Sequence, residues 1–398
     1  MASGTTSLPD TPPTASVEHV NIFHRYLFSE DAANSARKDE TYKHTELLPT
    51  FPSIKWNPLE LLKGLPEPGR NLSQPHAWKS GQLMNRQEIV YSEMSPSLGS
   101  EIRNMDLRTL GNAEKDELGA MLAERGLVVF RNQPNFTVDD QTALVSHFGP
   151  LYRHPTAGIP SEELSHIRVL YQGPESKPTP GFMSSVRQWH HDSPYELNPP
   201  GIISMRLLAA PPTGGDTVFS SGYDAYDLLS PGLQRFLEPL HAEHRPGQLD
   251  PLKMDMHARR PHTSAIHPVI CVHPVTGWKT VFAIGTKGST FGIVGLPQAE
   301  SEMLIDFLGA TVRDNINSQV RLQWDEETIA LWDNRCVFHA ATFNSYPHRR
   351  HAALISAVAN QPMSPEEARA ELLREPTSRA HSLDIEEKAA CSGGNNVI

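Results

Sequence analysis

Two short segments, far apart in the chain, combine histidine and aspartate in a spacing that suits a metal ion. The first reads Trp189-His190-His191-Asp192, and the second runs from Trp332-Asp333-Asn334-Arg335 to His339. An HxD pair plus one distant histidine is the ligand set of a 2-His-1-carboxylate facial triad. Such a triad holds Fe(II) on one face and leaves three positions open for a cosubstrate and oxygen. His190, Asp192 and His339 are therefore the candidate metal ligands and catalytic residues.

Strand geometry decides which of these side chains can share an ion. In a strand, residues i and i+2 project from the same face, so His190 and Asp192 can converge while His191 points away. A lone HxD recurs by chance in a chain with 19 histidines, and His339 alone is more commonly a buried structural histidine. The two motifs together, each beside a tryptophan, favour the metal site.

Arg350 and Thr217 are candidates for binding a carboxylate close to that metal. Arg350 follows His339 closely enough to lie on the next antiparallel strand, and a buried arginine offers a planar fork that matches a carboxylate. Thr217, in Gly214-Gly215-Asp216-Thr217, would add a hydroxyl donor. A surface arginine beside Arg349 and a turn threonine capping Asp216 are the alternative interpretations.

Composition excludes several classes of function. The 398-residue chain is 38% hydrophobic and carries a net charge of −11, so no nucleic-acid partner is expected. It has no run of about 18 apolar residues and no signal-like start, so no membrane partner is expected either. The three cysteines form no CxxC pair, which favours a reduced, cytoplasmic location. A small molecule is the expected partner, and self-association into a homo-oligomer is left open.

The chain divides into three parts by composition. Residues 1–85 are polar and irregular, with a stretch from Leu47 to Pro58 expected to wrap the body. Residues 86–375 form the main domain, and 376–398 a polar tail.

The main domain alternates helix and strand signals. Helices are expected over 113–125 before Gly126, over 137–148 with a Thr137–Asp140 capping box, from Ser230-Pro231, over 297–308 and over 366–373. The apolar side of the helix over 297–308 is expected to carry Met303, Leu304, Phe307 and Leu308. Strands are expected over 127–130, 202–208, 217–219, 328–332 and 352–358. This mix predicts a mainly β fold with flanking helices, a jelly-roll-like double sheet.

With these motifs in order, residues 90–362 resemble the taurine/sulfonate and 2,4-dichlorophenoxyacetate (TauD/TfdA-type) family of Fe(II)/2-oxoglutarate-dependent dioxygenases. The matching pieces are WHxD, PxxGGDT at 211–217, the histidine-proline segments at 267–277, WDNRxxxH and the arginine pair at 349–350. The long polar N-terminal extension is similar to that of fungal members. The resemblance implies a cupin-like double-stranded β-helix that uses Fe(II), 2-oxoglutarate and O2. It implies His190, Asp192 and His339 as iron ligands, and Thr217 with Arg350 as the 2-oxoglutarate carboxylate site.

Four further positions are expected at the substrate by the same resemblance. His154 keeps the pocket histidine of the family, whereas Val186 replaces a polar residue. Leu354 occupies the position of the arginine that pairs with sulfonates in similar proteins, and Phe343 would add apolar surface. A buried sulfonate without a cationic partner is costly. An aliphatic amino acid or a secondary-metabolite intermediate is therefore the expected substrate, undergoing hydroxylation, desaturation or oxidative ring closure.

Three other functions stand beside this one. A sulfonate or sulfate-ester dioxygenase with a rearranged anion site is the main alternative on the same fold. A silent β-barrel binding protein would keep the motifs as structure only. A zinc hydrolase also uses two histidines and a carboxylate, but it would give no role to Arg350 with Thr217.

Overall fold

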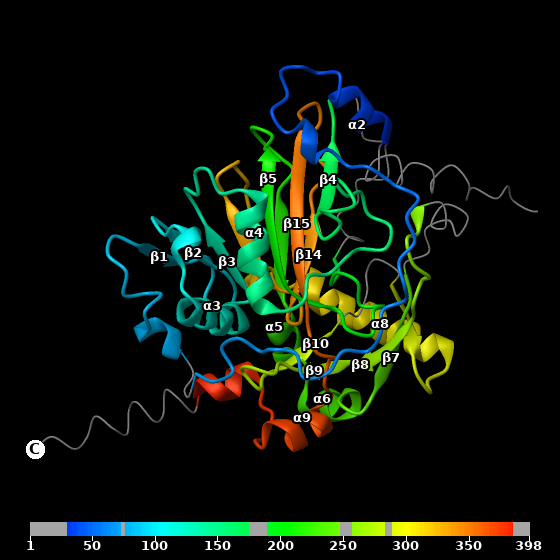
Figure 1. Cartoon of the computed structure of the whole chain (residues 1–398). Coiled ribbons are helices and arrows are strands. Elements are labelled where there is room, and N and C mark those ends of the chain that lie inside the picture. Colours follow the sequence, from blue (N-terminus) through cyan, green and yellow to red (C-terminus); the bar gives the residue numbers. More distant parts are fainter. Residues whose placement is uncertain (1–29, 73–75, 175–188, 247–256, 283–288, 385–398) are drawn as a thin grey trace, which may run out of the picture.

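The structure is a computed structural model that describes residues 30–72, 76–174, 189–246, 257–282 and 289–384 (Figure 1). The candidate substrate residue Val186 lies outside these described residues. No helix within the described ranges is long and apolar enough to cross a bilayer.

A seven-stranded sheet forms the centre of the molecule. Its strand order is β1-β2-β3-β13-β5-β15-β4, and every neighbouring pair is antiparallel except the parallel pair β2–β3. The strands are β1 Val90–Glu93, β2 Ser100–Arg103, β3 Leu127–Phe130, β13 Ile329–Asp333, β5 Pro200–Ala209, β15 Arg350–Val358 and β4 Arg168–Gln172.

Three smaller sheets make up the rest of the β structure in the described part of the chain. The sheet β12-β6-β14 contributes the second layer, and β11-β7-β8 and β10-β9 lie outside it. Their strands are β12 Gln319–Leu322, β6 Thr217–Ser221, β14 Val337–Ala341, β11 Thr290–Ile293, β7 His241–His244, β8 Ala265–Pro268, β10 Lys279–Val281 and β9 Ile270–Val272.

Alternation along the strands separates two cores. On β15, Ala352 and Leu354 join the inner core, which lies between the two main sheets. Ala353 and Ile355 join the outer core, which lies under the helices. The inner core also receives Phe219 from β6, so the β12-β6-β14 sheet faces the large sheet across it. Since side chains alternate with a period of two, every even-numbered residue from 350 to 354 faces the space between the sheets. This is the double-sheet jelly roll expected from the sequence.

Helices cover the outer face of the large sheet, with α4 crossing in front of β5 and β15 (Figure 1). The α-helices are α2 Glu30–Ala36, α3 Asn112–Arg125, α4 Val138–Val145, α5 Gly222–Asp227, α6 Pro231–Leu237, α8 Gln298–Arg313 and α9 Pro365–Leu372. The 3-10 helices are η1 Thr45–Leu47, η2 Ala77–Ser80, η3 Leu107–Thr109, η4 Ser146–Phe148 and η7 Ile316–Ser318.

Local capping signals fix several helix ends. Thr137 accepts a hydrogen bond from Asp140 N, while the Asp140 carboxylate accepts from Thr137 N, as a capping box requires. Gly126 ends α3 with φ of 69°, a left-handed conformation that favours glycine. The helix expected over 137–148 is divided into α4 and η4.

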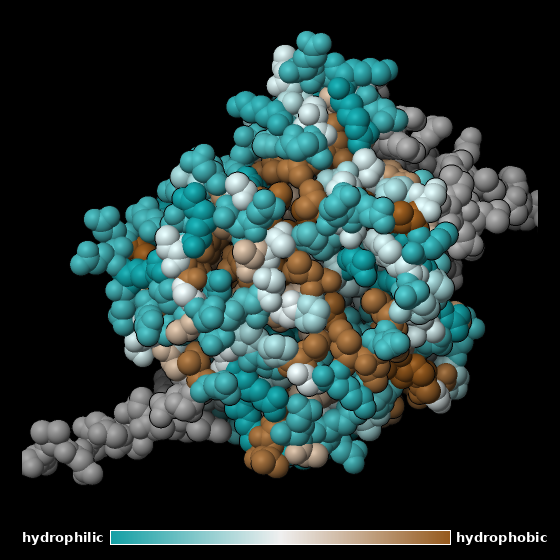
Figure 2. All heavy atoms as spheres, in the orientation of Figure 1, coloured by the Kyte–Doolittle hydropathy of each residue, from teal (hydrophilic) through white to brown (hydrophobic). Residues whose placement is uncertain are grey.

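The expected apolar face of α8 is only half correct. Leu304 and Leu308 are buried, but Met303 and Phe307 are 62% and 47% exposed, and the helix continues to Arg313. The buried stripe runs along Leu304, Leu308 and Val312 at steps of four residues, so it is narrower than the sequence pattern suggested. Apolar atoms are exposed on the side of the molecule where α8 and β7 lie (Figure 2).

The segment before β1 packs against the body. Leu48 and Trp78 are fully buried in the outer core. Thr50 and Ile159 exchange backbone hydrogen bonds, and Trp56 N donates to Arg259 O. Residues 47–56 therefore follow the surface as an irregular strap.

Candidate metal and cosubstrate site

The two histidines of the expected metal site are paired through their backbones. His190 N donates to His339 O, and His339 N donates to His190 O, both at 3.0 Å. His339 is the middle residue of β14, whose other edge pairs with β6, and His190 forms an isolated bridge outside the named strands. The imidazole centroids lie 4.2 Å apart. This bridge brings together two segments that are remote in the sequence.

Asp192 completes a cluster of three possible ligands. Its Oδ1 is 3.5 Å from His190 Nε2, and its Oδ2 is 3.9 Å from His339 Nε2. One donor atom from each residue lies within 4.8 Å of the others. A first-row divalent ion bonded at roughly 2.0–2.2 Å joins ligand atoms roughly 3–4.4 Å apart, so small side-chain movements suffice to bind one. Two imidazoles and one carboxylate suit Fe(II), so the residues present fit this metal.

The cluster is largely buried but keeps a small exposed surface. The side chains of His190, Asp192 and His339 are 13%, 8% and 10% exposed, so none is sealed in the core. His191, between the two ligands, is buried instead and stacks on Phe338 with centroids 3.9 Å apart. The alternation expected for this segment thus directs His191 away from the cluster.

Asn334 holds the Asp192 backbone in place. Its Oδ1 accepts a hydrogen bond from Asp192 N at 2.7 Å, and its Nδ2 donates to Asp192 O at 3.1 Å and to Pro200 O at 2.9 Å. Asn334 is fully buried in the turn between β13 and β14. The asparagine of the WDNR motif therefore positions the carboxylate, a role that the sequence did not reveal.

Arg168 is a second residue that sequence reasoning missed. It is the first residue of β4, and its Nη1 donates to Asp192 Oδ1 at 3.0 Å. Burial alone would raise the pKa of Asp192, but the Arg168 guanidinium and the neighbouring histidines hold it well below its usual range. The carboxylate is therefore ionised. No motif marks this arginine, and the strand β4 was not among the strands predicted from the sequence.

Arg350 and Thr217 lie at the same end of the two-sheet layer. Arg350 begins β15 with only 6% of the residue exposed, and its Nε donates to Gly215 O at 2.9 Å. A Cβ at Gly215, where φ is +65°, would lie 2.9 Å from Arg350 Cδ, which explains why the turn carries glycine. Thr217 begins β6, and its Oγ1 accepts from Trp324 Nε1 at 3.0 Å, which leaves the hydroxyl proton available to donate.

The alternative interpretations of these two residues do not match this geometry. Arg350 is buried, whereas the adjacent Arg349 points to the other face and donates to Tyr171 and Asp39. Asp216 pairs with Arg321 at 2.6 Å and is not capped by Thr217.

Three of the four expected substrate residues lie in the described part of the chain, on three different segments. Leu354 is 4% exposed and stands in register with Arg168 on β4 and Met205 on β5. Phe343 follows β14 and is 7% exposed. His154 Nδ1 accepts from Thr156 N and Ala157 N, and burial followed by the charge of Arg168 lowers the pKa of His154 well below 6.5. Its imidazole is therefore neutral.

A second cluster with metal-binding residue types does not offer the same chemistry. His273, Asp333 and Cys336 are all buried and close together. Both oxygens of Asp333 are taken by Arg335, at 2.8 and 2.6 Å, and His273 bonds the same carboxylate. A cation there would have to displace a guanidinium, so this cluster is an internal ion-pair network.

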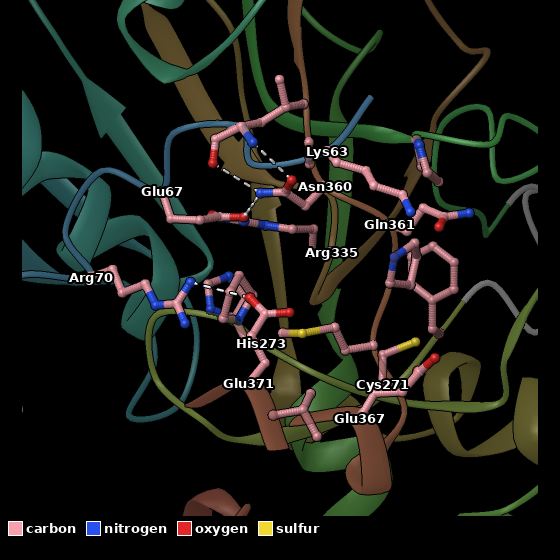
Figure 3. A pocket seen from close by; sticks show the side chains of 18 of the residues that line it. Lys63, Glu67, Arg70, Cys271, His273, Arg335, Asn360, Gln361, Glu367 and Glu371 are labelled. Atoms are coloured by element: carbon pink, nitrogen blue, oxygen red, sulfur yellow. Dashed lines mark hydrogen bonds and ion pairs between the residues drawn. The ribbon is translucent and has the colours of Figure 1, made fainter. Parts of the chain in front are cut away.

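A cavity of about 420 Å³ borders that network (Figure 3). Its charged walls bond one another: Arg335 reaches Glu67 at 2.6 Å, Asn360 donates to Glu67 at 2.9 Å, and Arg70 pairs with Glu371 at 3.3 Å. None of the three candidate iron ligands lines it. The cavity is therefore separate from the candidate metal cluster.

Known proteins share both the sequence and the fold of this chain. A family model described as taurine catabolism dioxygenase TauD, TfdA family, matches residues 91–355. The alpha-ketoglutarate-dependent sulfonate dioxygenase of Saccharomyces cerevisiae is 33% identical over 340 residues, which cover 81% of this chain and 80% of that protein. The alpha-ketoglutarate-dependent dioxygenase cnsP of Penicillium expansum is 36% identical over 282 residues, covering 68% and 75%. The crystal structure of a taurine dioxygenase from Burkholderia xenovorans superposes with a TM-score of 0.58 at 26% identity, covering 70% of this chain and 94% of that one.

Proposed function

The chain belongs to the TauD, TfdA family of taurine catabolism dioxygenases, and from this premise we propose that His190, Asp192 and His339 bind the iron with which it oxidises a small metabolite. It is a 2-oxoglutarate-dependent dioxygenase that uses Fe(II), 2-oxoglutarate and O2. The observation that carries the residue assignment is the cluster of one donor atom from each of the three side chains within 4.8 Å.

The bound metal and cosubstrates supply the oxidising power that breaks a C–H bond of the substrate, while 2-oxoglutarate becomes succinate and CO2. The chain supplies binding and orientation. Arg350 binds the distal carboxylate of 2-oxoglutarate through its buried fork, and the Thr217 hydroxyl donates to the same carboxylate. Asn334 fixes the backbone of Asp192, and the His190–His339 bridge fixes both imidazoles. The buried side chains of Leu354 and Phe343 limit water around the reacting carbon.

The substrate that we propose is an aliphatic amino acid or a secondary-metabolite intermediate, oxidised by hydroxylation, desaturation or ring closure. The apolar Leu354 and Phe343 support an aliphatic body. A sulfonate or sulfate ester is the second candidate. It is favoured by Arg168, which provides a cation on the strand beside Leu354, and by the sulfonate dioxygenase name of the yeast relative.

Anaerobic spectroscopy and a substrate screen test this function. Fe(II) plus 2-oxoglutarate should give the weak visible absorption of a metal chelate in the intact protein, and succinate release should identify substrates. Absence of the band would favour a silent binding protein. Turnover of taurine, with none of aliphatic amino acids, would reverse the order of the two substrate candidates.

We also propose a cytoplasmic location and a main catalytic domain over 86–375, between an extension over 1–85 and a tail over 376–398. Cys271 and Cys336 are free, buried thiols, which suits a reducing compartment. The family match over 91–355 falls within the proposed domain.

A further inference from the structure

We propose that Arg168 binds an acidic group of the substrate, so that this enzyme acts on an organic acid anion held from β4. The inference rests on the proposed function, because it places the substrate beside Asp192 and its metal. It concerns a residue that lies outside the matched sequence motifs.

The strand register places Arg168 on the face that carries the site. β4 lies beside β15 (Figure 1), and Arg168 is paired with Leu354 in the antiparallel ladder. Directly opposed residues in such a ladder share one face, with Cβ atoms about 4.5–5.5 Å apart. The alternation agrees, since Val169 and Tyr171 join the outer core and Leu170 packs on the inner one. Arg168 therefore places a cation beside the uncharged Leu354, on the same face of the sheet.

The guanidinium has unused hydrogen-bonding capacity. An arginine carries five N–H donors, and Arg168 uses one of them in a hydrogen bond to Asp192. Its Nε is buried and has no hydrogen-bond partner among the residues that the structure describes. The side chain as a whole is 22% exposed, so a ligand can reach it. A buried donor left without a partner is costly, which favours a ligand that accepts from it.

Charge balance points the same way. The formal charges of Fe(II), Asp192, Arg350 and dianionic 2-oxoglutarate sum to zero, so Arg168, which shares the Asp192 carboxylate with the metal, adds one positive charge to the loaded site. Of the other buried arginines in this region, Arg260 pairs with Glu196 at 2.6 Å, and Arg259 donates to the Ala157 carbonyl at 2.7 Å. Because an uncompensated charge in a desolvated site is unfavourable, the loaded site favours an anionic group of the substrate beside Arg168.

The planar fork of arginine matches a carboxylate or a sulfonate, and the neighbouring Leu354 matches a hydrocarbon chain. An amino acid carboxylate and a sulfonate share this chemistry, so both substrate candidates are compatible with Arg168. A metabolite without an acidic group is not compatible with Arg168. Leu354 on β15 carries no charge, and Arg168 on the adjacent strand β4 supplies the cation instead.

The test compares the affinities of matched ligands under anaerobic conditions. Alkyl sulfonates and alkyl carboxylates of graded chain length are titrated by calorimetry against neutral alkyl amides of the same length, with Fe(II) and 2-oxoglutarate present. The wild type should bind at least one acid series about 30-fold more tightly than the amides, as expected for a desolvated charge pair. The two acid series identify which acid group is preferred.

Variants separate a substrate role from a structural one. Arg168→Leu should abolish the preference for acids, while the visible Fe(II)–2-oxoglutarate band still forms at saturating Fe(II), because the variant loses a hydrogen bond to Asp192 but keeps all three candidate ligands. The double variant Arg168→Leu/Leu354→Arg should recover part of that preference, because it moves the cation to the opposed position on β15. Arg206→Leu is the matched control: Arg206 on β5 is paired with Ala353, which faces the outer core. It should change neither readout.

Three results would overturn the proposal: a wild type without preference for acids, an Arg168→Leu variant that retains the preference, or loss of the band in Arg168→Leu. The last result would assign Arg168 to the metal site. A wild type without the band would instead refute the proposed function. The calorimetric preference is measured independently of that band, so it still decides the role of Arg168.

Discussion

His190 and His339 are joined by reciprocal backbone hydrogen bonds, so the main chain sets the spacing of their imidazoles before any metal binds. His190 pairs with His339 on the edge of β14 that does not face β6. The side chain of His339 can therefore be removed without removing the bridge itself. This separates loss of a ligand from loss of the fold.

We expect His339→Ala to lose iron binding and turnover while the melting temperature changes little. An ion bound through two of three protein ligands is held much more weakly, and the backbone bridge persists. Fe(II) titration, the visible chelate band and thermal unfolding measure these effects. His348→Ala, at an exposed position in the following turn, is the control and should match the wild type. Full iron affinity in His339→Ala would remove His339 from the ligand set.

Arg350→Ala should weaken 2-oxoglutarate binding far more than Arg349→Ala. Removing the partner of a buried carboxylate costs about 2–5 kcal/mol, and Arg350 is buried beside Gly215. Arg349 lies on the opposite face with Asp39 and Tyr171, so its loss should leave the cosubstrate affinity unchanged. Titration of the chelate band with 2-oxoglutarate compares the two variants. Equal affinities would contradict the assignment of Arg350.

Much of this site was predictable because its signals are local or carried by motifs. The Thr137–Asp140 capping box, Gly126 and the strand over 127–130 depend on neighbours in sequence, and the structure confirms all three. The family and the fold class are confirmed as well. Arg168 was not predictable, because its place beside Leu354 depends on the pairing of β4 with β15. The buried face of α8 was only partly predicted. The spacing of apolar residues in the sequence does not show how many of them the neighbouring elements cover.

Ionisation of the Asp227 carboxyl should lower the free energy of unfolding as pH rises from about 4 to about 6. Burial raises the pKa of Asp227 from 3.8 to about 6, and repulsion from Asp224 adds to the shift. Its Oδ2 accepts from Ala380 N, but its buried Oδ1 has no partner among the described residues. The folded state then binds the proton more tightly than the unfolded state. The free energy of unfolding therefore decreases as pH rises through this window and stays lower above it.

Asp227→Asn removes this effect and keeps an oxygen for Ala380 N. We expect the variant to be about 1–2 kcal/mol more stable than the wild type at pH 7, less than the full value of a two-unit shift because the carboxyl is partly solvated. Near pH 4 the difference should vanish. Chemical denaturation at both pH values measures it, with Asp384→Asn as an exposed control. A gain of equal size at both pH values would show that charge is not the cause.

His351 should make the docking of Tyr42 and Leu47, at the start of the strap, sensitive to acid. Its Nε2 contacts Leu47 O at 3.0 Å, and its Nδ1 is bonded to the Tyr42 hydroxyl. Because Nε2 donates to the Leu47 carbonyl, Nδ1 of the neutral ring accepts from the Tyr42 hydroxyl, and a protonated ring could no longer accept there. Burial lowers the pKa of His351 from 6.5 to about 3. The unfolded state therefore binds the proton first, and the stabilisation, complete above about pH 6.5, is lost as pH falls toward 3.

Hydrogen exchange of residues 40–50, measured relative to the intrinsic exchange rate at each pH, should therefore become faster in mild acid before the large sheet opens. Tyr42→Phe leaves Nδ1 of a buried ring unsatisfied, at a cost of about 1–3 kcal/mol, and should produce the same faster exchange already at neutral pH. Tyr346→Phe changes an exposed tyrosine and serves as the control. Because His351 follows Arg350 on β15, release of the strap should also weaken 2-oxoglutarate binding. Unchanged exchange in Tyr42→Phe would mean that packing of Leu47 and Leu48, and not the histidine, holds the strap.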